Sequence, residues 1–164
     1  MLPDPIFKEA LLRMAIAMLL GCIVGVDRNM RGKPTGVKTL GLVALGSCLV
    51  TMAGAGFALH GIAGNDATSR AIQGIVTGIG FLGAGVIVQN VDGDKIRGLT
   101  TAASIWVTAA LGIVCGVGAW SVAVIATILF ILLLVIGRVA EHALHRHWLA
   151  KPQEHRDAML DNEE

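Results

Sequence analysis

Residues 119–137, AWSVAVIATILFILLLVIG, form an apolar stretch without a charged side chain, and Arg138 follows it directly. A bilayer core of about 30 Å needs about 20 helical residues, so this length predicts a membrane-spanning helix rather than a helix buried in a soluble protein. Similar apolar blocks precede it at about 11–26, 39–59, 71–88 and 100–117. The sequence therefore predicts five spans, the first of them interrupted near its start by Arg13.

The composition agrees with a membrane protein and excludes an ordinary soluble domain. Of the 164 residues, 54% are apolar and 15% are charged, and the mean hydropathy is +0.70. Because the apolar runs are continuous and do not alternate, they predict helices and not the strands of a barrel. We expect an all-α, polytopic transmembrane bundle over residues 1–137, followed by a charged tail over 138–164.

The cations in the connections predict the orientation, since positive loops favour the cytoplasmic side. Three cations, Lys8, Arg13 and Arg70, fall on one predicted side. The other side receives ten: Arg28, Arg31, Lys33, Lys38, Lys95, Arg97, Arg138, Arg146, Lys151 and Arg156. We therefore expect an outside N-terminus and a cytoplasmic C-terminus. The net charge of +1 is spread through loops that face lipid headgroups and does not indicate nucleic-acid binding.

Several motifs resemble catalytic or ligand sites but lack their context. GIGFLG at 78–83 matches a dinucleotide fingerprint, yet it lies inside an apolar membrane run and not between a strand and a helix. GKPT at 32–35 resembles a phosphate loop, but Pro34 follows Lys33 where that loop needs Ser or Thr. NVDGD at 90–94 resembles the start of a calcium loop, but Lys95 replaces its required glycine. We expect no catalytic site, no cofactor and no metal site, and therefore not an enzyme.

Glycines one turn apart predict close helix packing, within the chain or between two copies. The pairs are Gly21 and Gly25, Gly74 and Gly78, and Gly112 and Gly116, and the third block adds Gly80, Gly83 and Gly85. Three cysteines, Cys22, Cys48 and Cys115, lie inside spans without metal-binding spacing, so we expect them to be small packing residues.

Charged residues at the ends of two spans have helical spacing for ion pairs. Glu9 and Arg13 are four residues apart, as are Asp66 and Arg70. These arginines either have a functional role or extend to the lipid headgroups.

The stretch RGLTTAASIW at 97–106 places a cation and two hydroxyls at the entrance of the fourth span. Thr100 or Thr101 has the position to cap that helix, and Gly98 allows a tight turn. We expect Arg97 to pair with Asp27, which leaves the other hydroxyl and the helix N-terminus to bind an anion, a lipid headgroup or a carboxylate of a partner.

Three strings identify a resemblance over residues 11–137. GVDRNMRGKPTGVKTLGLVALGS (25–47), TGIGFLGAGVIV (77–88) and RGLTTAASIWVTAALGIVCG (97–116) closely resemble the MgtC/SapB family of bacterial inner-membrane proteins. By resemblance, the residues that the family pattern marks are Arg13, Gly21, Gly25, Asp27, Arg28, Gly36, Thr39, Arg70, the glycines of 80–85, Arg97, Gly98, Thr100, Thr101 and Trp106.

This sequence departs from the family pattern at three points. Lys38 stands where the family commonly has Arg before Thr39, which keeps the charge but loses the bidentate fork. Gln73 lies three and not four residues after Arg70, as in one subgroup. MgtC also carries a cytoplasmic C-terminal domain, whereas residue 164 lies 27 positions beyond Gly137, so we expect a short form without that domain's activity.

The resemblance implies an accessory, regulatory role in adaptation to low magnesium and, in pathogens, in survival within macrophages. It implies an inner-membrane location and membrane partners such as the ATP synthase or transport ATPases. A small oligomeric ion or solute transporter or channel is the alternative, because interior polar residues and glycine-rich helices also suit a transporter.

Overall fold

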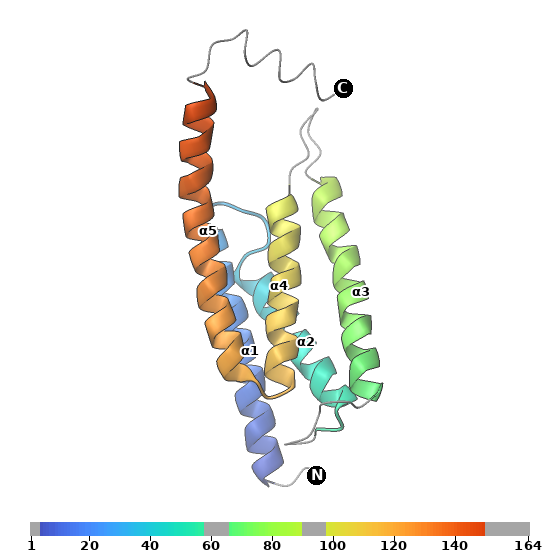
Figure 1. Cartoon of the computed structure of the whole chain (residues 1–164). Helices are drawn as coiled ribbons and strands as arrows, with labels where there is room; N and C mark the ends of the chain where they lie inside the picture. Colours follow the sequence, from blue (N-terminus) through green and yellow to red (C-terminus); the bar gives the residue numbers. More distant parts are fainter. Residues whose placement is uncertain (1–3, 58–65, 90–97, 150–164) are drawn as a thin grey trace. The chain divides into compact units, whose positions relative to one another are not determined.

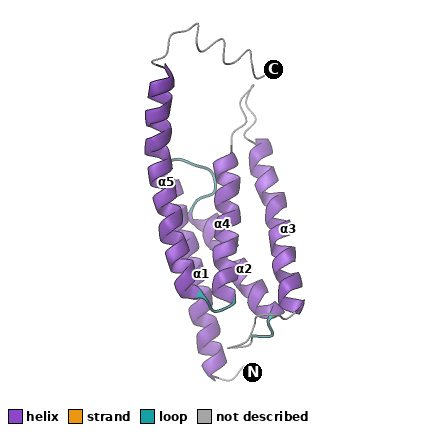
Figure 2. Cartoon of the chain, in the orientation of Figure 1, coloured by secondary structure: helices purple, strands orange, loops and turns teal. Residues whose placement is uncertain are grey.

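A computed structural model describes residues 4–57, 66–89 and 98–149. Within them the chain is all-α, with helices α1 (Asp4–Asn29), α2 (Val37–Gly54), α3 (Asp66–Gln89), α4 (Leu99–Gly116) and α5 (Trp120–Leu149). Each helix is long and apolar enough to cross a membrane, and no strand is found in these ranges (Figure 2). The predicted five-span, all-α architecture is therefore confirmed.

The chain forms two compact units, Met1–Ile128 and Leu129–Glu164. The first unit contains α1 to α4 and the beginning of α5. The second contains the rest of α5, in which Arg138 donates a 3.2 Å hydrogen bond to the carbonyl oxygen of Leu134. The helix therefore continues past Gly137 to Leu149, so the expected boundary between membrane domain and tail does not coincide with a helix end.

Helix α2 packs between α1 and α4, and glycines make both contacts close. A Cβ atom built on Gly21 of α1 would lie 2.5 Å from the carbonyl oxygen of Leu40 in α2. On the other side, a Cβ on Gly116 of α4 would lie 2.9 Å from the carbonyl oxygen of Cys48. Gly25 and Gly112 meet the backbone of α2 in the same way. The packing role predicted for these two pairs is confirmed.

Helix α3 lies at the edge of the first unit, beside α4 and α2 (Figure 1). Gly83 is buried, and a Cβ atom on it would lie 3.5 Å from the Cβ of Ala102 in α4. A Cβ on Gly74, Gly78, Gly80 or Gly85 would meet nothing within 4 Å. The expectation of packing over 80–85 is therefore correct within one chain only at Gly83.

Two of the cysteines fill the center of the unit. Cys48 and Cys115 are fully buried, Cys22 is half-buried, and all three are free thiols. The prediction that they are packing residues is confirmed.

The ends of the helices differ from the predicted spans. Helix α2 ends at Gly54 rather than near residue 59, and Gly56 and Phe57 follow with φ of 64° and 57°. These left-handed backbone angles end the helix. Helix α1 begins earlier than residue 11, at Asp4, because helical hydrogen bonding continues among charged residues beyond the apolar run.

Candidate functional site

The most unusual side chain in the first unit is Arg28, a cation that is 3% exposed near the end of α1. Its Nη1 donates a hydrogen bond of 2.9 Å to the Ser104 hydroxyl, and its Nη2 donates one of 2.5 Å to the Thr101 hydroxyl. Nη2 also donates to the carbonyl oxygen of Pro34 at 3.2 Å. These four residues, Arg28, Pro34, Thr101 and Ser104, are called the Arg28 cluster below.

The helical repeat explains why these residues meet. On α1, the buried positions Gly21, Val24, Gly25 and Arg28 follow one face at spacings of three and four. On α4, Thr101 and Ser104 are three residues apart, so they lie about one helical turn apart on the same face. Arg28 near the end of α1 reaches Thr101 and Ser104 near the beginning of α4, so these two helix ends lie side by side.

The acceptors of Arg28 are neutral, which is costly for a buried cation. Among the residues that the structure describes, no carboxylate forms an ion pair with Arg28, because Asp27 pairs with Arg31 instead. The Nε atom of Arg28 is buried and has no hydrogen-bond partner in this part of the chain. The cation also lies at the N-terminal end of α4, where the helix dipole favours an anion. The cluster therefore concentrates positive potential at this end of the unit.

The capping prediction for α4 is wrong. Gly98 is the N-cap residue with φ of 93°, and no side chain of the described residues caps the helix. The tight turn expected at Gly98 is confirmed. Because α4 begins at Leu99, both threonines lie in its first turn and not at the cap. Thr101 accepts a hydrogen bond from Arg28, and Thr100 is exposed. Arg97 lies outside the described residues, so its expected pairing with Asp27 stays a prediction.

A second buried arginine ties α1 to the other end of α4. Arg13 is 4% exposed, and its Nε donates to Glu9 at 2.9 Å, which confirms the predicted ion pair. Its Nη1 donates to the carbonyl oxygen of Gly116, the last residue of α4, at 3.1 Å. A cation is favourable at a helix C-terminus. Gly118, with φ of 89°, lies close enough that a Cβ atom would be 2.8 Å from Nη2 of Arg13.

The other predicted site residues are exposed and do not join either arginine. Lys38 and Thr39 are exposed on the first turn of α2, Trp106 is 52% exposed on α4, and Arg70 is exposed on α3. The second predicted ion pair, between Asp66 and Arg70, is not found among the described residues.

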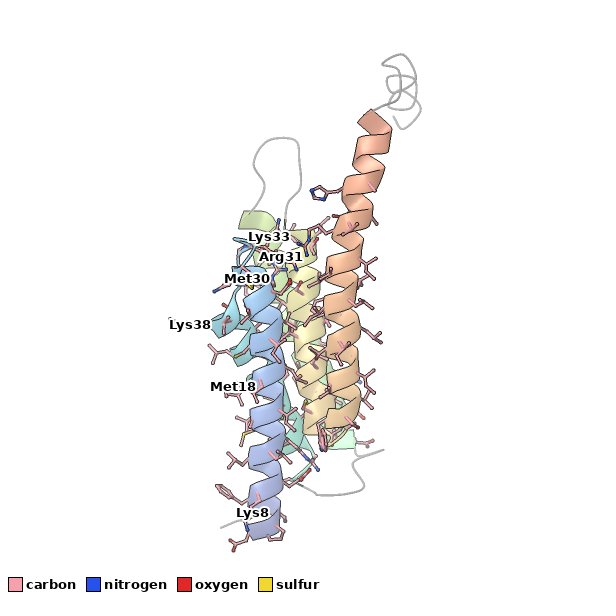
Figure 3. The ribbon with its side chains drawn as sticks, turned by 90° about the vertical axis from the view of Figure 1, so that its left-hand side faces the viewer. Lys8, Met18, Met30, Arg31, Lys33 and Lys38 are labelled. Carbon is pink, nitrogen blue, oxygen red and sulfur yellow. The ribbon has the colours of Figure 1, made fainter. Side chains whose placement is uncertain are left out.

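Basic side chains gather at the end that holds the Arg28 cluster. Figure 3 shows Arg31 and Lys33 after α1 and Lys38 on the first turn of α2, whereas Lys8 lies at the opposite end of α1. Within the first unit, the described cations of the two predicted groups therefore lie toward opposite ends of the helices. The side of the membrane that each end faces stays a prediction.

Sequence reasoning missed three partners of the arginines: Ser104, Pro34 and the carbonyl of Gly116. Ser104 lies one helical turn after Thr101, which was the available signal. No group of three or more His, Cys, Asp or Glu side chains able to hold a metal ion occurs over residues 4–57, 66–89 and 98–149.

Comparison with known proteins gives one family. The model of the MgtC family matches residues 14–143. SrpB of Synechococcus elongatus is 43% identical over 131 residues, covering 74% of this chain and 71% of that protein. MgtC of Salmonella typhimurium is 36% identical over 137 residues, and SapB of Bacillus subtilis is 38% identical over 130. These alignments cover 83% and 77% of the chain but 55% of each relative, and no solved structure matches.

Proposed function

The chain belongs to the MgtC family, and from that membership we propose that it is an accessory inner-membrane protein of adaptation to low magnesium. It acts by contact with a membrane protein that uses or makes ATP, such as the ATP synthase or a transport ATPase, and carries no ions itself. In a pathogen, the same role would support survival within macrophages.

The close packing between α1, α2 and α4 is the observation that carries this proposal. A transport path needs polar groups that face an open interior. At Gly21 and Gly116 the helices are so close that even a methyl group would overlap the backbone of α2. At these glycines there is no room for a path between α1, α2 and α4, which favours a protein that acts through its surface.

The buried hydroxyl groups support the same conclusion. Thr51 donates to the carbonyl oxygen of Ser47 at 2.7 Å, and Thr108 donates to that of Ser104 at 2.7 Å. Each hydroxyl is thus bonded to its own helix, four residues back. The donor of each hydroxyl is therefore satisfied within its own helix and needs no water-filled path between the helices.

The end that carries the Arg28 cluster is the proposed contact surface. Lys33 and Lys38 are exposed there, and the buried charge of Arg28 adds to their potential. The predicted orientation has this end in the cytoplasm. A partner would therefore present carboxylates or other anionic groups to it.

Two assays on the same protein test the proposal. The chain is expressed in a bacterium that lacks its own MgtC-family protein, and growth is measured at limiting magnesium. The purified protein is also reconstituted in liposomes, in which magnesium, potassium and proton flux are measured, with an added ionophore as positive control. We expect restored growth and no flux above that of protein-free liposomes.

Lys33→Gln with Lys38→Gln is the matched variant, because both side chains are exposed and their replacement leaves the packed helices intact. We expect normal abundance and reduced growth. Flux that rises with the amount of protein would contradict the proposal and favour the oligomeric transporter or channel.

A further inference from the structure

The polar side chains of α3 point away from the rest of the first unit. Asp66, Arg70, Gln73 and Thr77 follow each other at spacings of four, three and four, and all four are exposed. At 100° per residue they share one face of the helix. Thr68, Ile79 and Gly83 are buried on the opposite face.

This arrangement is the reverse of the one that lipid favours, since polar residues in membrane helices normally face the protein interior. Gln73 lies seven residues after Asp66, about 10 Å along the helix axis. The Thr77 hydroxyl donates to the carbonyl oxygen of Gln73 at 2.9 Å, which satisfies that donor. The side-chain amide of Gln73 forms no hydrogen bond with any residue that the structure describes. An amide at this depth needs a partner.

A glycine beside these polar groups leaves the backbone accessible. Gly80 lies seven residues after Gln73 and therefore on the same face, and a Cβ atom on it would meet nothing within 4 Å. A bare backbone gains nothing from contact with lipid, but it allows another helix to approach closely. The face formed by Asp66, Arg70, Gln73, Thr77 and Gly80 is called the polar α3 face below.

We propose that the polar α3 face binds the same face of a second copy of this chain, with the two α3 helices side by side and parallel. Copies of one membrane protein insert in the same orientation, so a twofold axis along the membrane normal brings like residues together. This inference goes beyond the proposed function and does not depend on which membrane protein is the partner.

The chemistry of the face is self-complementary, which favours a second copy over a different protein. A glutamine amide both donates and accepts, so two Gln73 side chains can satisfy each other. Asp66 and Arg70 carry opposite charges one turn apart and are not paired with each other. In a symmetric pair, Asp66 of each copy can bind Arg70 of the other, which gives two ion pairs at the helix ends.

Cysteine cross-linking in native membranes tests the contact. In a full-length background with Cys22, Cys48 and Cys115 replaced by Ala, Thr77→Cys is compared with Leu42→Cys. Thr77 is exposed on the polar α3 face and its hydroxyl bonds its own helix, so its replacement leaves Asp66, Arg70 and Gln73 in place. Leu42 is 68% exposed on α2 and lies on a different helix, so it reports random collision. We expect at least about threefold more cross-linked dimer at Thr77 than at Leu42, because a specific contact keeps the two Thr77 positions close to each other. Equal yields at the two positions would overturn the proposal.

A second experiment keeps the test independent of the cysteine at position 77. Dimerisation of the otherwise native chain is measured by energy transfer between labelled copies in liposomes, over a range of protein-to-lipid ratios. Gln73→Leu is expected to weaken association about three- to thirtyfold. Asp66→Arg should also weaken it, and adding Arg70→Asp to the same chain should restore it. Unchanged association in Gln73→Leu, or no recovery in the charge-exchanged double variant, would overturn the proposal.

Discussion

The Arg28 guanidinium on α1 donates a 2.9 Å hydrogen bond to the Ser104 hydroxyl on α4, across 76 positions of sequence. The Ser104 hydroxyl in turn donates to the carbonyl oxygen of Thr100 at 2.7 Å. The hydroxyl is therefore held by two hydrogen bonds, one that it accepts from Arg28 and one that it donates to Thr100. Together with the contact between Arg13 and Gly116, this bond holds α1 against both ends of α4. The two arginines therefore connect α1 with both ends of α4.

Replacement of Arg28 by Lys should destabilise the protein although the charge is kept. A lysine ammonium cannot match the planar fork that reaches Ser104, Thr101 and Pro34 together, and hydroxyls in the interior would lose their donors. We expect a loss of about 1–3 kcal/mol in the free energy of unfolding. Thermal unfolding in detergent measures it.

Arg31→Lys is the control, since Arg31 is partly exposed and contacts only Asp27 among these groups. It should change the unfolding temperature much less. If Arg28→Lys and Arg31→Lys unfold at the same temperature, the Arg28 cluster does not hold the helices together.

The helices of this protein were predictable because their signal is local. Five apolar runs of nearly bilayer length indicate five spans whatever their partners are. The pairing of Glu9 with Arg13 was equally local, at four residues within one helix. The ends of α1 and α5 were missed because a count of apolar residues stops at the first charge, whereas helical hydrogen bonds continue to Leu149.

The candidate site was only half predictable, since its contacts depend on helix packing. Arg28 and Thr101 were both marked by resemblance, but nothing in the sequence joined them. Thr101 had the residue type and position of a cap. In the structure Gly98 is the N-cap residue, with a left-handed backbone, so Thr101 lies within the helix. The exposed polar side of α3 also required the structure, because the sequence does not say which side of that helix α2 and α4 cover.

Arg13 should contribute more to stability through Gly116 than through Glu9. Glu9 is partly exposed, so Glu9→Gln removes an ion pair worth about 0–1 kcal/mol. Arg13→Met also removes the donor to a buried helix-end carbonyl, which should cost about 1–3 kcal/mol. Unfolding in detergent should rank the variants in that order, and a larger loss in Glu9→Gln would contradict the assignment.

The close contact of α4 with α2 should not accept a methyl group at Gly112. A Cβ atom there would overlap the carbonyl oxygen of Ala44 and lie 2.9 Å from the Cβ of Ser47. We expect Gly112→Ala to destabilise the protein by about 1–3 kcal/mol. Gly46→Ala is the matched control, because a Cβ on Gly46 meets nothing within 4 Å. It should be neutral or stabilising by up to about 1 kcal/mol, since Ala favours a helix over Gly.

The separation of cations between the two ends predicts the side of the membrane on which each loop lies. Gly64→Cys and Gly93→Cys, each in a background without the native cysteines, should react with a membrane-impermeant thiol reagent from opposite sides of the inner membrane. Gly64→Cys should be labelled from outside and Gly93→Cys only after permeabilisation. Labelling of both from the same side would contradict the predicted topology.

Arg97 should differ from Arg28 in what its loss disturbs. Arg28 already binds Thr101, and Asp27 already pairs with Arg31, so these contacts of the described residues form without Arg97. We therefore expect Arg97→Ala to unfold at nearly the native temperature and to be produced at normal abundance. If Arg97 contacts an anionic group of a partner, Arg97→Ala will fail to restore growth at low magnesium, and Arg97→Lys will restore much less than its charge predicts, because an ammonium lacks the bidentate geometry. The labelling of Gly93→Cys in the Arg97→Ala background separates this role from an effect on topology. Full growth with Arg97→Ala at normal abundance would show that growth at low magnesium does not need Arg97. The predicted contact with an anionic group of a partner would then be wrong.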